Sequence, residues 1–193
     1  MRTVHYLSSA CLLVLILSVA GCYESLTSIV TPDKLIAIDS LAGDYKAVDS
    51  GLGRLTIEKG DGKTGVYRQL DDKGSVRCKG TFAVVKLGAD HFYQMTVDGF
   101  ATADGRPVYL IGRLHVEGPA GARTLTGYSF KTPQALLGDG SIQTSECDYR
   151  EGAETKKRHG ISTPTADLQA FLAKRGGEMT TPSFKFKQAG RAG

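Results

Sequence analysis

The chain has 193 residues, and 24 Lys and Arg against 20 Asp and Glu give it a net charge of +4. A nucleic-acid-binding domain gathers a stronger positive excess on one face, so this class of protein is excluded. The length suits one domain with its own core, and the high glycine content, 24 residues, favours short strands joined by turns over a helical bundle.

The first 22 residues have the three parts of a secretory signal. Arg2 gives a positive start, residues 10–20 are apolar except for Ser18, and small side chains lead into Cys22. The apolar run is too short to span a bilayer, which takes about 20 residues. The segment therefore predicts export of the chain and removal of residues 1–21.

The sequence Val19-Ala20-Gly21-Cys22 resembles the lipobox of bacterial lipoproteins. The resemblance implies cleavage before Cys22, diacylglycerol on its sulfur and an acyl chain such as palmitate on its new amino group. In that family, Asp directly after the cysteine favours retention at the inner membrane of many Gram-negative cells. Tyr23 at this position implies the outer membrane, with the domain on the periplasmic side. In a cell with one membrane, the domain would lie outside.

Residues 22–42 have no strong pattern and are interpreted as a lipidated tether. From Gly43 onward, apolar and polar residues alternate in short runs; in 54–59, for example, Leu55 and Ile57 share one face. Turns rich in Gly and Asp, such as Asp104-Gly105, separate the runs. The candidate strands are 44–49, 54–59, 65–70, 75–87, 91–98, 107–116, 123–130 and 141–149.

This succession predicts a mainly β fold, an antiparallel meander that closes into a barrel of about eight strands. A two-sheet sandwich is the competing architecture. The segment Gly43-Asp44-Tyr45 opening a strand series, with a helix after the strands, resembles lipocalin-type barrels. The Gly-x-Trp signature of that family is missing, because the chain has no Trp. The resemblance therefore implies a fold and no binding residue.

The C-terminal part contains one helix, predicted over 165–175 and packed on the barrel or plugging one of its ends. Thr165 is its expected N-cap, Gly176 its stop, and three apolar residues share one face: Leu168, Phe171 and Leu172. The polar stretch 151–162 before it predicts an exposed loop. Residues 183–187 predict an edge strand, because their lysines discourage further pairing. The single domain then covers 43–187, and 188–193 form a disordered tail.

Cys78 and Cys147 are the two cysteines left after export and lipidation, and they predict a disulfide between adjacent strands. The neighbours of the first are cations and those of the second are anions, so the pairs would meet on the opposite face. A bridge closing a loop of about 70 residues is worth roughly 4 kcal/mol. The alternative is two buried free thiols.

The sequence predicts no catalytic residue, metal or cofactor. His91, His115 and His159 have no partner at metal-ligand spacing, and nucleophile-elbow and C-x-x-C motifs are absent. The basic run 156–159 either contacts anionic lipid headgroups or forms a solvated loop. Five residues could line a cavity inside the barrel or fill it: Tyr93, Met95, Tyr109, Tyr128 and Phe130.

Two classes of function follow. The first is a lipid-anchored envelope lipoprotein, a non-catalytic binding or interaction module that contacts the membrane through Cys22. Its further partner would be an envelope protein or a small apolar ligand. The alternative is a periplasmic envelope enzyme, which requires His91 or His115 within hydrogen-bond reach of an acid and a nucleophile.

Overall fold

Alternating apolar side chains organise most of this chain into strands. The structure is a computed structural model that describes residues 23–48, 51–61, 63–131, 137, 140–151 and 154–189. The predicted signal segment 1–21, the predicted lipid site Cys22 and the last four residues of the predicted tail lie outside the described residues.

The described strands are β1 (Tyr23–Ser25), β2 (Leu35–Ile36), β3 (Gly43–Ala47), β4 (Arg54–Lys59), β5 (Gly65–Leu70), β6 (Val76–Leu87), β7 (Asp90–Met95), β8 (Phe100–Thr102), β9 (Tyr109–Glu117), β10 (Thr124–Ser129), β11 (Thr144–Glu151), β12 (Glu154–Ile161) and β13 (Thr181–Gln188). The described helical elements include α3 (Thr165–Arg175) and two 3-10 turns, η1 (Ile38–Leu41) and η2 (Gly176–Glu178).

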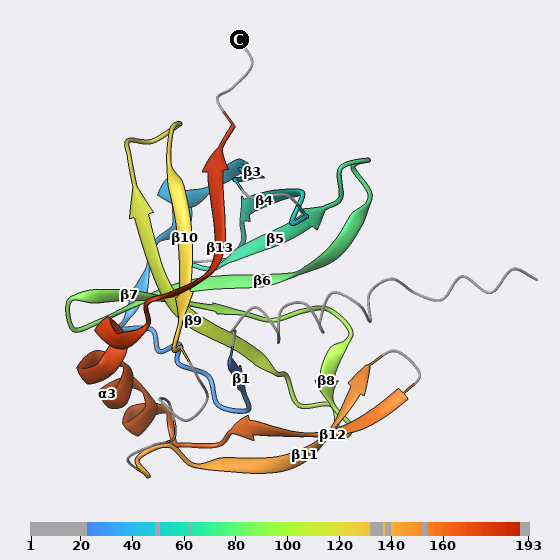
Figure 1. Ribbon diagram of the computed structural model, residues 1–193, viewed down its shortest axis with the longest axis vertical. Coiled ribbons are helices and arrows are strands. Elements are labelled where there is room, and N and C mark those ends of the chain that lie inside the picture. Colours follow the sequence, from blue (N-terminus) through green and yellow to red (C-terminus); the bar gives the residue numbers. More distant parts are fainter. Residues whose placement is uncertain are drawn as a thin grey trace, which may run out of the picture.

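Eight antiparallel strands close into a barrel, which confirms the predicted architecture over the sandwich (Figure 1). The order is β3, β4, β5, β6, β7, β9, β10 and β13, and β13 pairs again with β3. Each strand neighbours the next barrel strand in the sequence, as in a meander. The insertions are β8, between β7 and β9, and the segment β11–β12–α3, between β10 and β13.

The eighth barrel strand is β13 and not the candidate at 141–149. The prediction of an edge strand over 183–187 is wrong, because β13 is hydrogen-bonded to β10 on one side and to β3 on the other. Gln188, predicted to begin a disordered tail, is the last residue of β13. Its side-chain oxygen accepts hydrogen bonds from the backbone of Gly121 (3.0 Å) and Arg123 (3.2 Å).

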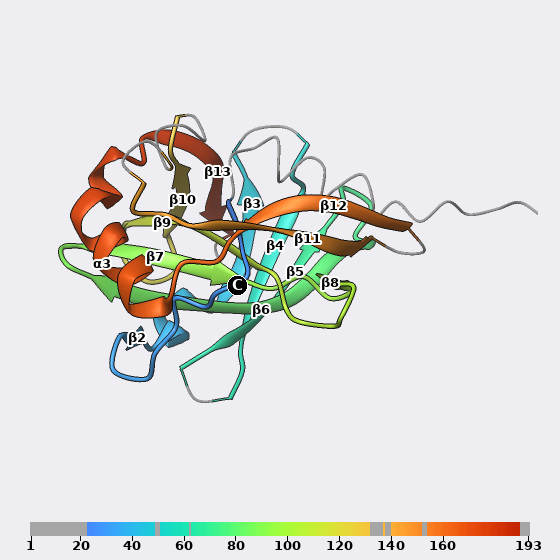
Figure 2. The ribbon, with the colours of Figure 1, turned by 90° about the horizontal axis from the view of Figure 1, so that it is seen from below.

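A second arm of the sheet leaves the barrel at β9. Residues 109–111 of β9 pair with β1, and residues 113–117 pair with β10. From β1 the arm continues through β12 and β11 to β8; we call these four strands the side sheet (Figures 1 and 2). The predicted loop over 151–162 is therefore wrong for most of its length, since β12 covers Glu154–Ile161.

The predicted tether over 22–42 is also wrong for the residues that the structure describes. Besides β1, β2 and η1, whose Ile38 is 1% exposed, this stretch contributes Ile29, which is fully buried. The side-chain oxygen of the buried Gln94 accepts hydrogen bonds from Ser28 Oγ (3.1 Å) and Ile29 N (2.7 Å). The segment is therefore part of the folded domain.

Two apolar clusters hold these layers together. The interior of the barrel contains Tyr93 and Met95, whereas Tyr109, Tyr128 and Phe130 pack in a second cluster with α3. The five residues proposed to share one interior are thus divided between two.

The buried face of α3 consists of Leu168, Phe171 and Leu172, as predicted, and it covers the outside of β6, β7 and β9. The predicted N-cap is wrong. Thr165 is the first helical residue, and its hydroxyl donates to the carbonyl oxygen of Ser28 at 2.9 Å.

Candidate functional site

The strand β1 begins at Tyr23, directly after Cys22, the residue that the sequence predicts to carry lipid. Tyr23 is paired with Ile111 of β9, and Ser25 is paired with both Tyr109 of β9 and Ile161 of β12. Ser25 is fully buried, and the next backbone N–H, of Leu26, donates to Ile161 O at 2.8 Å. The chain is therefore fixed between two strands within three residues of Cys22.

An ion pair adds to this fixation. The guanidinium of Arg158 on β12 donates to the carboxylate of Glu24 on β1 at 2.7 Å. The two side chains are only 18% and 10% exposed. Water screens such a pair far less than it screens a surface pair, so loss of one partner leaves a costly charge behind.

A buried tyrosine lies beside this ion pair. Tyr149 on β11 is fully buried, and its hydroxyl has no hydrogen-bond partner in the described part of the molecule. Burial raises the pKa of Tyr149, and the nearby Glu24 carboxylate raises it further. A methyl group on Gly160 of β12 would lie 2.3 Å from the Tyr149 hydroxyl oxygen, so glycine is required there. The neutral phenol fills space at the junction between barrel and side sheet.

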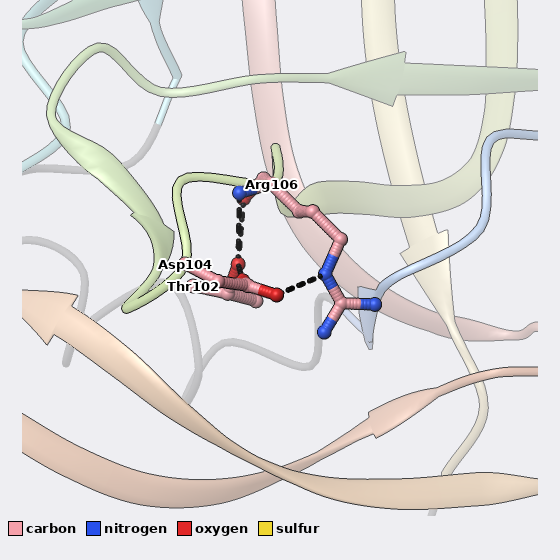
Figure 3. A network of polar contacts seen from close by, with 3 residues as sticks. All are labelled: Thr102, Asp104 and Arg106. Atoms are coloured by element: carbon pink, nitrogen blue, oxygen red, sulfur yellow. Dashed lines mark hydrogen bonds and ion pairs between the residues drawn. The ribbon is translucent and has the colours of Figure 1, made fainter.

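The turn after β8 is stabilised by the polar network in Figure 3. The Thr102 hydroxyl donates to the Asp104 carboxylate, Arg106 N donates to the Thr102 hydroxyl at 2.9 Å, and Arg106 Nε donates to Asp104 Oδ2 at 2.9 Å. The Thr102 hydrogen bond, followed by the Arg106 charge, lowers the pKa of Asp104. Gly105 has a φ of +85°, which fits the predicted turn at Asp104-Gly105. The donors and acceptors satisfy one another, as expected of a structural turn.

Cys78 and Cys147, the predicted disulfide pair, are both free thiols. Their strands, β6 and β11, are not neighbours: Cys78 is paired with Gln69 of β5, and Cys147 with Arg158 of β12. The Cys78 thiol contacts Gln69 Oε1 at 3.4 Å, and burial raises its pKa to about 11. The predicted adjacency is therefore wrong and the bridge is not formed.

The charges next to the cysteines have partners other than those expected. Lys79 pairs with Asp98 at 3.6 Å, and Arg77 donates to the carbonyl oxygen of Gly51 at 2.7 Å. Glu146 pairs with Lys157 at 3.2 Å. Charge complementarity between two short segments did not determine which strands pair.

Each residue of the basic run 156–159 also lies near an acid. Lys156 is 3.3 Å from Glu154, and Lys157 and His159 both lie near Glu146, at 3.2 and 4.0 Å. Arg158 is held by Glu24, as described above. Alternation along β12 sends these residues to both faces of the side sheet. The run is therefore not a single cationic surface, which weakens the expectation that it contacts lipid headgroups.

The histidines give the enzyme alternative little support. His115 Nε2 lies 3.0 Å from Glu117 Oε1, but both side chains are more than half exposed and belong to the same strand. His91 is on β7, opposite Lys86 and Leu114. No group of three or more His, Cys, Asp and Glu side chains suited to a metal ion occurs among the described residues.

An open cleft of about 380 Å³ lies beside α3. One wall belongs to the helix and includes Asp167, Lys174 and Arg175. The other wall consists of Ser141, Gln143, Thr163 and Pro164. Arg175 is held by Glu178 at 2.6 Å. None of the described helices is long and apolar enough to cross a membrane.

Comparisons of the chain with models of known families, with characterised proteins and with solved structures found no match.

Proposed function

We propose that this protein is a lipid-anchored envelope lipoprotein that acts as a non-catalytic interaction module. The observation that carries the proposal is the position of the folded domain in the sequence. The apolar segment and Val19-Ala20-Gly21 end at Cys22, and Tyr23 already belongs to a strand, the first among the described residues. A signal that is cut before Cys22 would leave the described fold intact and place the lipid-bearing residue directly before β1.

Lipid on Cys22 would explain membrane affinity better than the positive charges of the basic run 156–159 would. The basic run on β12 is matched by Glu24, Glu146 and Glu154, so it has little charge left to attract anionic headgroups. Two acyl chains suffice for stable anchoring, and an N-acyl diacylglycerol cysteine carries three. By resemblance to lipoproteins, Tyr23 after Cys22 favours the periplasmic side of the outer membrane.

A protein partner fits the barrel better than a small apolar ligand inside it. Tyr45, Tyr67 and Tyr93 project into the interior cluster and are at most 1% exposed. Aromatic rings also lie against the wall: a methyl group on Gly127 would be 2.4 Å from the Phe184 ring. Small barrels of eight strands either pack solid or hold one ligand, and these side chains favour the solid form.

The test is labelling of the full chain with a palmitate analogue in a bacterial host. We expect label in the unaltered chain and in Cys11→Ala, whose substitution falls in the discarded segment, and none in Cys22→Ala. Mass spectrometry should then find an acylated N-terminal peptide that begins at Cys22. An unacylated N-terminus, or cleavage at another position, would overturn the proposal.

A further inference from the structure

In the proposed anchor, the lipid-bearing residue is joined to the folded domain without an intervening linker. Tyr23 is bonded directly to Cys22, and adjacent Cα atoms are about 3.8 Å apart. Tyr23 is itself the first residue of β1 and is paired with Ile111. A flexible tether of the length expected for residues 22–42 would have allowed the domain to rotate above the membrane, whereas the described residues 23–42 belong to the fold.

The start of β1 is also difficult to detach from the fold. Backbone pairing holds it to β9 and β12, and the Glu24–Arg158 ion pair would have to be broken. Behind it, Ile29 is fully buried and its backbone is held by Gln94 and Gln169. Lengthening the connection by unfolding β1 would therefore expose buried apolar and charged groups.

Tyr23 is paired with β9 close to the point where the partner of β9 changes from β1 to β10. Arg113 lies two residues beyond Ile111 on the same face of β9, about 7 Å along the strand. It is paired with Tyr128 of β10, and its guanidinium lies over the Tyr128 ring at 4.9 Å. Asp90 is 3.5 Å from the same guanidinium.

This arrangement has the chemistry of a membrane interface. Both side chains are half-buried, with an aromatic ring and a guanidinium together on the outside of the barrel. Tyrosine prefers the headgroup level of a bilayer, because its ring is apolar and its hydroxyl polar. The Arg113 side chain is only 21% exposed and its guanidinium is shared with Asp90, so the junction presents a nearly neutral polar pair beside the ring and not a free cation.

We propose that the barrel is held flush against the bilayer, with the β1–β9 junction facing the membrane and Arg113 and Tyr128 at the level of the phospholipid headgroups. The proposal rests on the lipid anchor at Cys22 and specifies how that anchor orients the domain. The occupant of this surface is the phospholipid bilayer into which the acyl chains are inserted.

The test is photo-crosslinking of the full, lipidated chain in native membranes. A photoreactive phenylalanine analogue replaces Tyr128 in one variant and Val76 in a matched control. Val76 is exposed and begins β6, where it is paired with Leu70 of β5, and β6 is not a neighbour of β1, β9 or β10 in the sheet. We expect phospholipid adducts at position 128 and at least fivefold fewer at position 76. Equal yields at the two positions would overturn the proposal.

A second variant restores the missing tether. Insertion of Tyr and about ten Gly and Ser residues between Cys22 and Tyr23 leaves Tyr after Cys22 and β1 intact, and adds a reach of about 17 Å. Adducts at position 128 should fall at least threefold, while acylation measured by mass spectrometry is unchanged. Unchanged crosslinking would mean that the short connection does not set the orientation. Absence of acylation in the parent chain would instead refute the anchor itself, and the flush orientation with it.

The guanidinium can be tested separately with Arg113→Gln in the chain that carries the probe at position 128. The substitution leaves the Asp90 carboxylate without its partner beside the anionic surface, and this uncompensated negative charge should lower the adduct yield about fivefold. Arg175→Gln is the matched control, because Arg175 also lies over an aromatic ring, that of Phe171, at 5.4 Å on α3. Equal yields in the two variants, with circular dichroism showing both folded, would exclude Arg113 from the membrane contact.

Discussion

Arg158 donates a 2.7 Å hydrogen bond to Glu24 across 134 positions of sequence. The pair joins the first strand to the side sheet, and its side chains are only 18% and 10% exposed. This pairing also explains why the basic run 156–159 looked like an exposed loop in the sequence. The run lies in a strand whose cations are matched by acids on both faces.

The first prediction concerns this ion pair. Arg158→Ala should lower the free energy of unfolding by about 3 kcal/mol, because the Glu24 carboxylate would be left largely buried without its partner. Urea denaturation followed by circular dichroism measures the change.

The neighbouring Lys157 provides the control for this experiment. Its pair with Glu146 is 71% and 50% exposed. Lys157→Ala should therefore change the free energy of unfolding far less than Arg158→Ala does, because water screens this exposed pair. Equal losses for the two variants would show that the Glu24–Arg158 pair is effectively solvated.

Local alternation was sufficient to predict strands with a regular pattern. The bounds of β4, β5 and α3 were predicted as the structure has them, since Leu55 and Ile57 alternate with polar residues and Leu168, Phe171 and Leu172 have helical spacing. β12 escaped detection because ion pairs and not apolar side chains occupy both of its faces.

Long-range pairing was less predictable. The lysines of β13 suggested an edge, but in a closed barrel the outward side chains of any strand can be charged. The fork of β9 and the burial of residues 23–42 leave no periodic signal, because they depend on contacts between distant segments. The same holds for the Glu24–Arg158–Tyr149 junction.

The second prediction concerns the unpartnered hydroxyl of Tyr149. Tyr149→Phe should raise the free energy of unfolding by about 1 kcal/mol, because it removes a buried polar group that lacks a hydrogen bond. Tyr45→Phe is the contrasting variant, since the Tyr45 hydroxyl donates to Leu41 O at 2.8 Å, and it should cost about 1 kcal/mol. A loss of stability in Tyr149→Phe would reveal a hydrogen bond to this hydroxyl.

The third prediction concerns the thiols. Under denaturing conditions without reductant, Cys78 and Cys147 should both react with iodoacetamide, as free thiols do. Addition of reductant should leave the urea midpoint unchanged, whereas a bridge across this loop would contribute roughly 4 kcal/mol. Mass spectrometry of the purified protein counts the alkylated residues, and a single species in which neither cysteine is alkylated would show that the disulfide is present.

The fourth prediction is a loss of stability in alkali. Burial raises the pKa of Cys78 from 9.0 to about 11 and that of Tyr45 from 10.0 to about 12. Between the ordinary and the raised pKa of each group, the unfolded chain loses a proton that the folded chain keeps. The stabilisation that comes from the two buried neutral groups is therefore complete below about pH 9, and it is lost as the pH rises through 11 and 12. In Cys78→Ala, the fall in unfolding free energy between pH 9 and 11 should be shallower. Parallel curves would mean that the thiol is solvated in the folded state.

The last prediction tests whether the barrel interior is filled. The Tyr93 ring is fully buried, lies 5.3 Å from that of Phe184, and is so close to the wall that a methyl group on Gly112 would be 2.5 Å from its hydroxyl oxygen. Tyr93→Ala should cost about 3–5 kcal/mol and leave an enclosed apolar cavity. Such cavities bind benzene, so benzene should raise the melting temperature of this variant and not that of the parent.

Phe171→Ala separates this effect from a general loss of aromatic surface. Phe171 belongs to the outer cluster and borders the open cleft beside α3, so its removal enlarges a solvent-filled surface and creates no closed cavity. Benzene should not stabilise it. If benzene stabilised the parent chain as well, the interior would already contain a cavity, and a small apolar ligand would replace a protein as the expected partner.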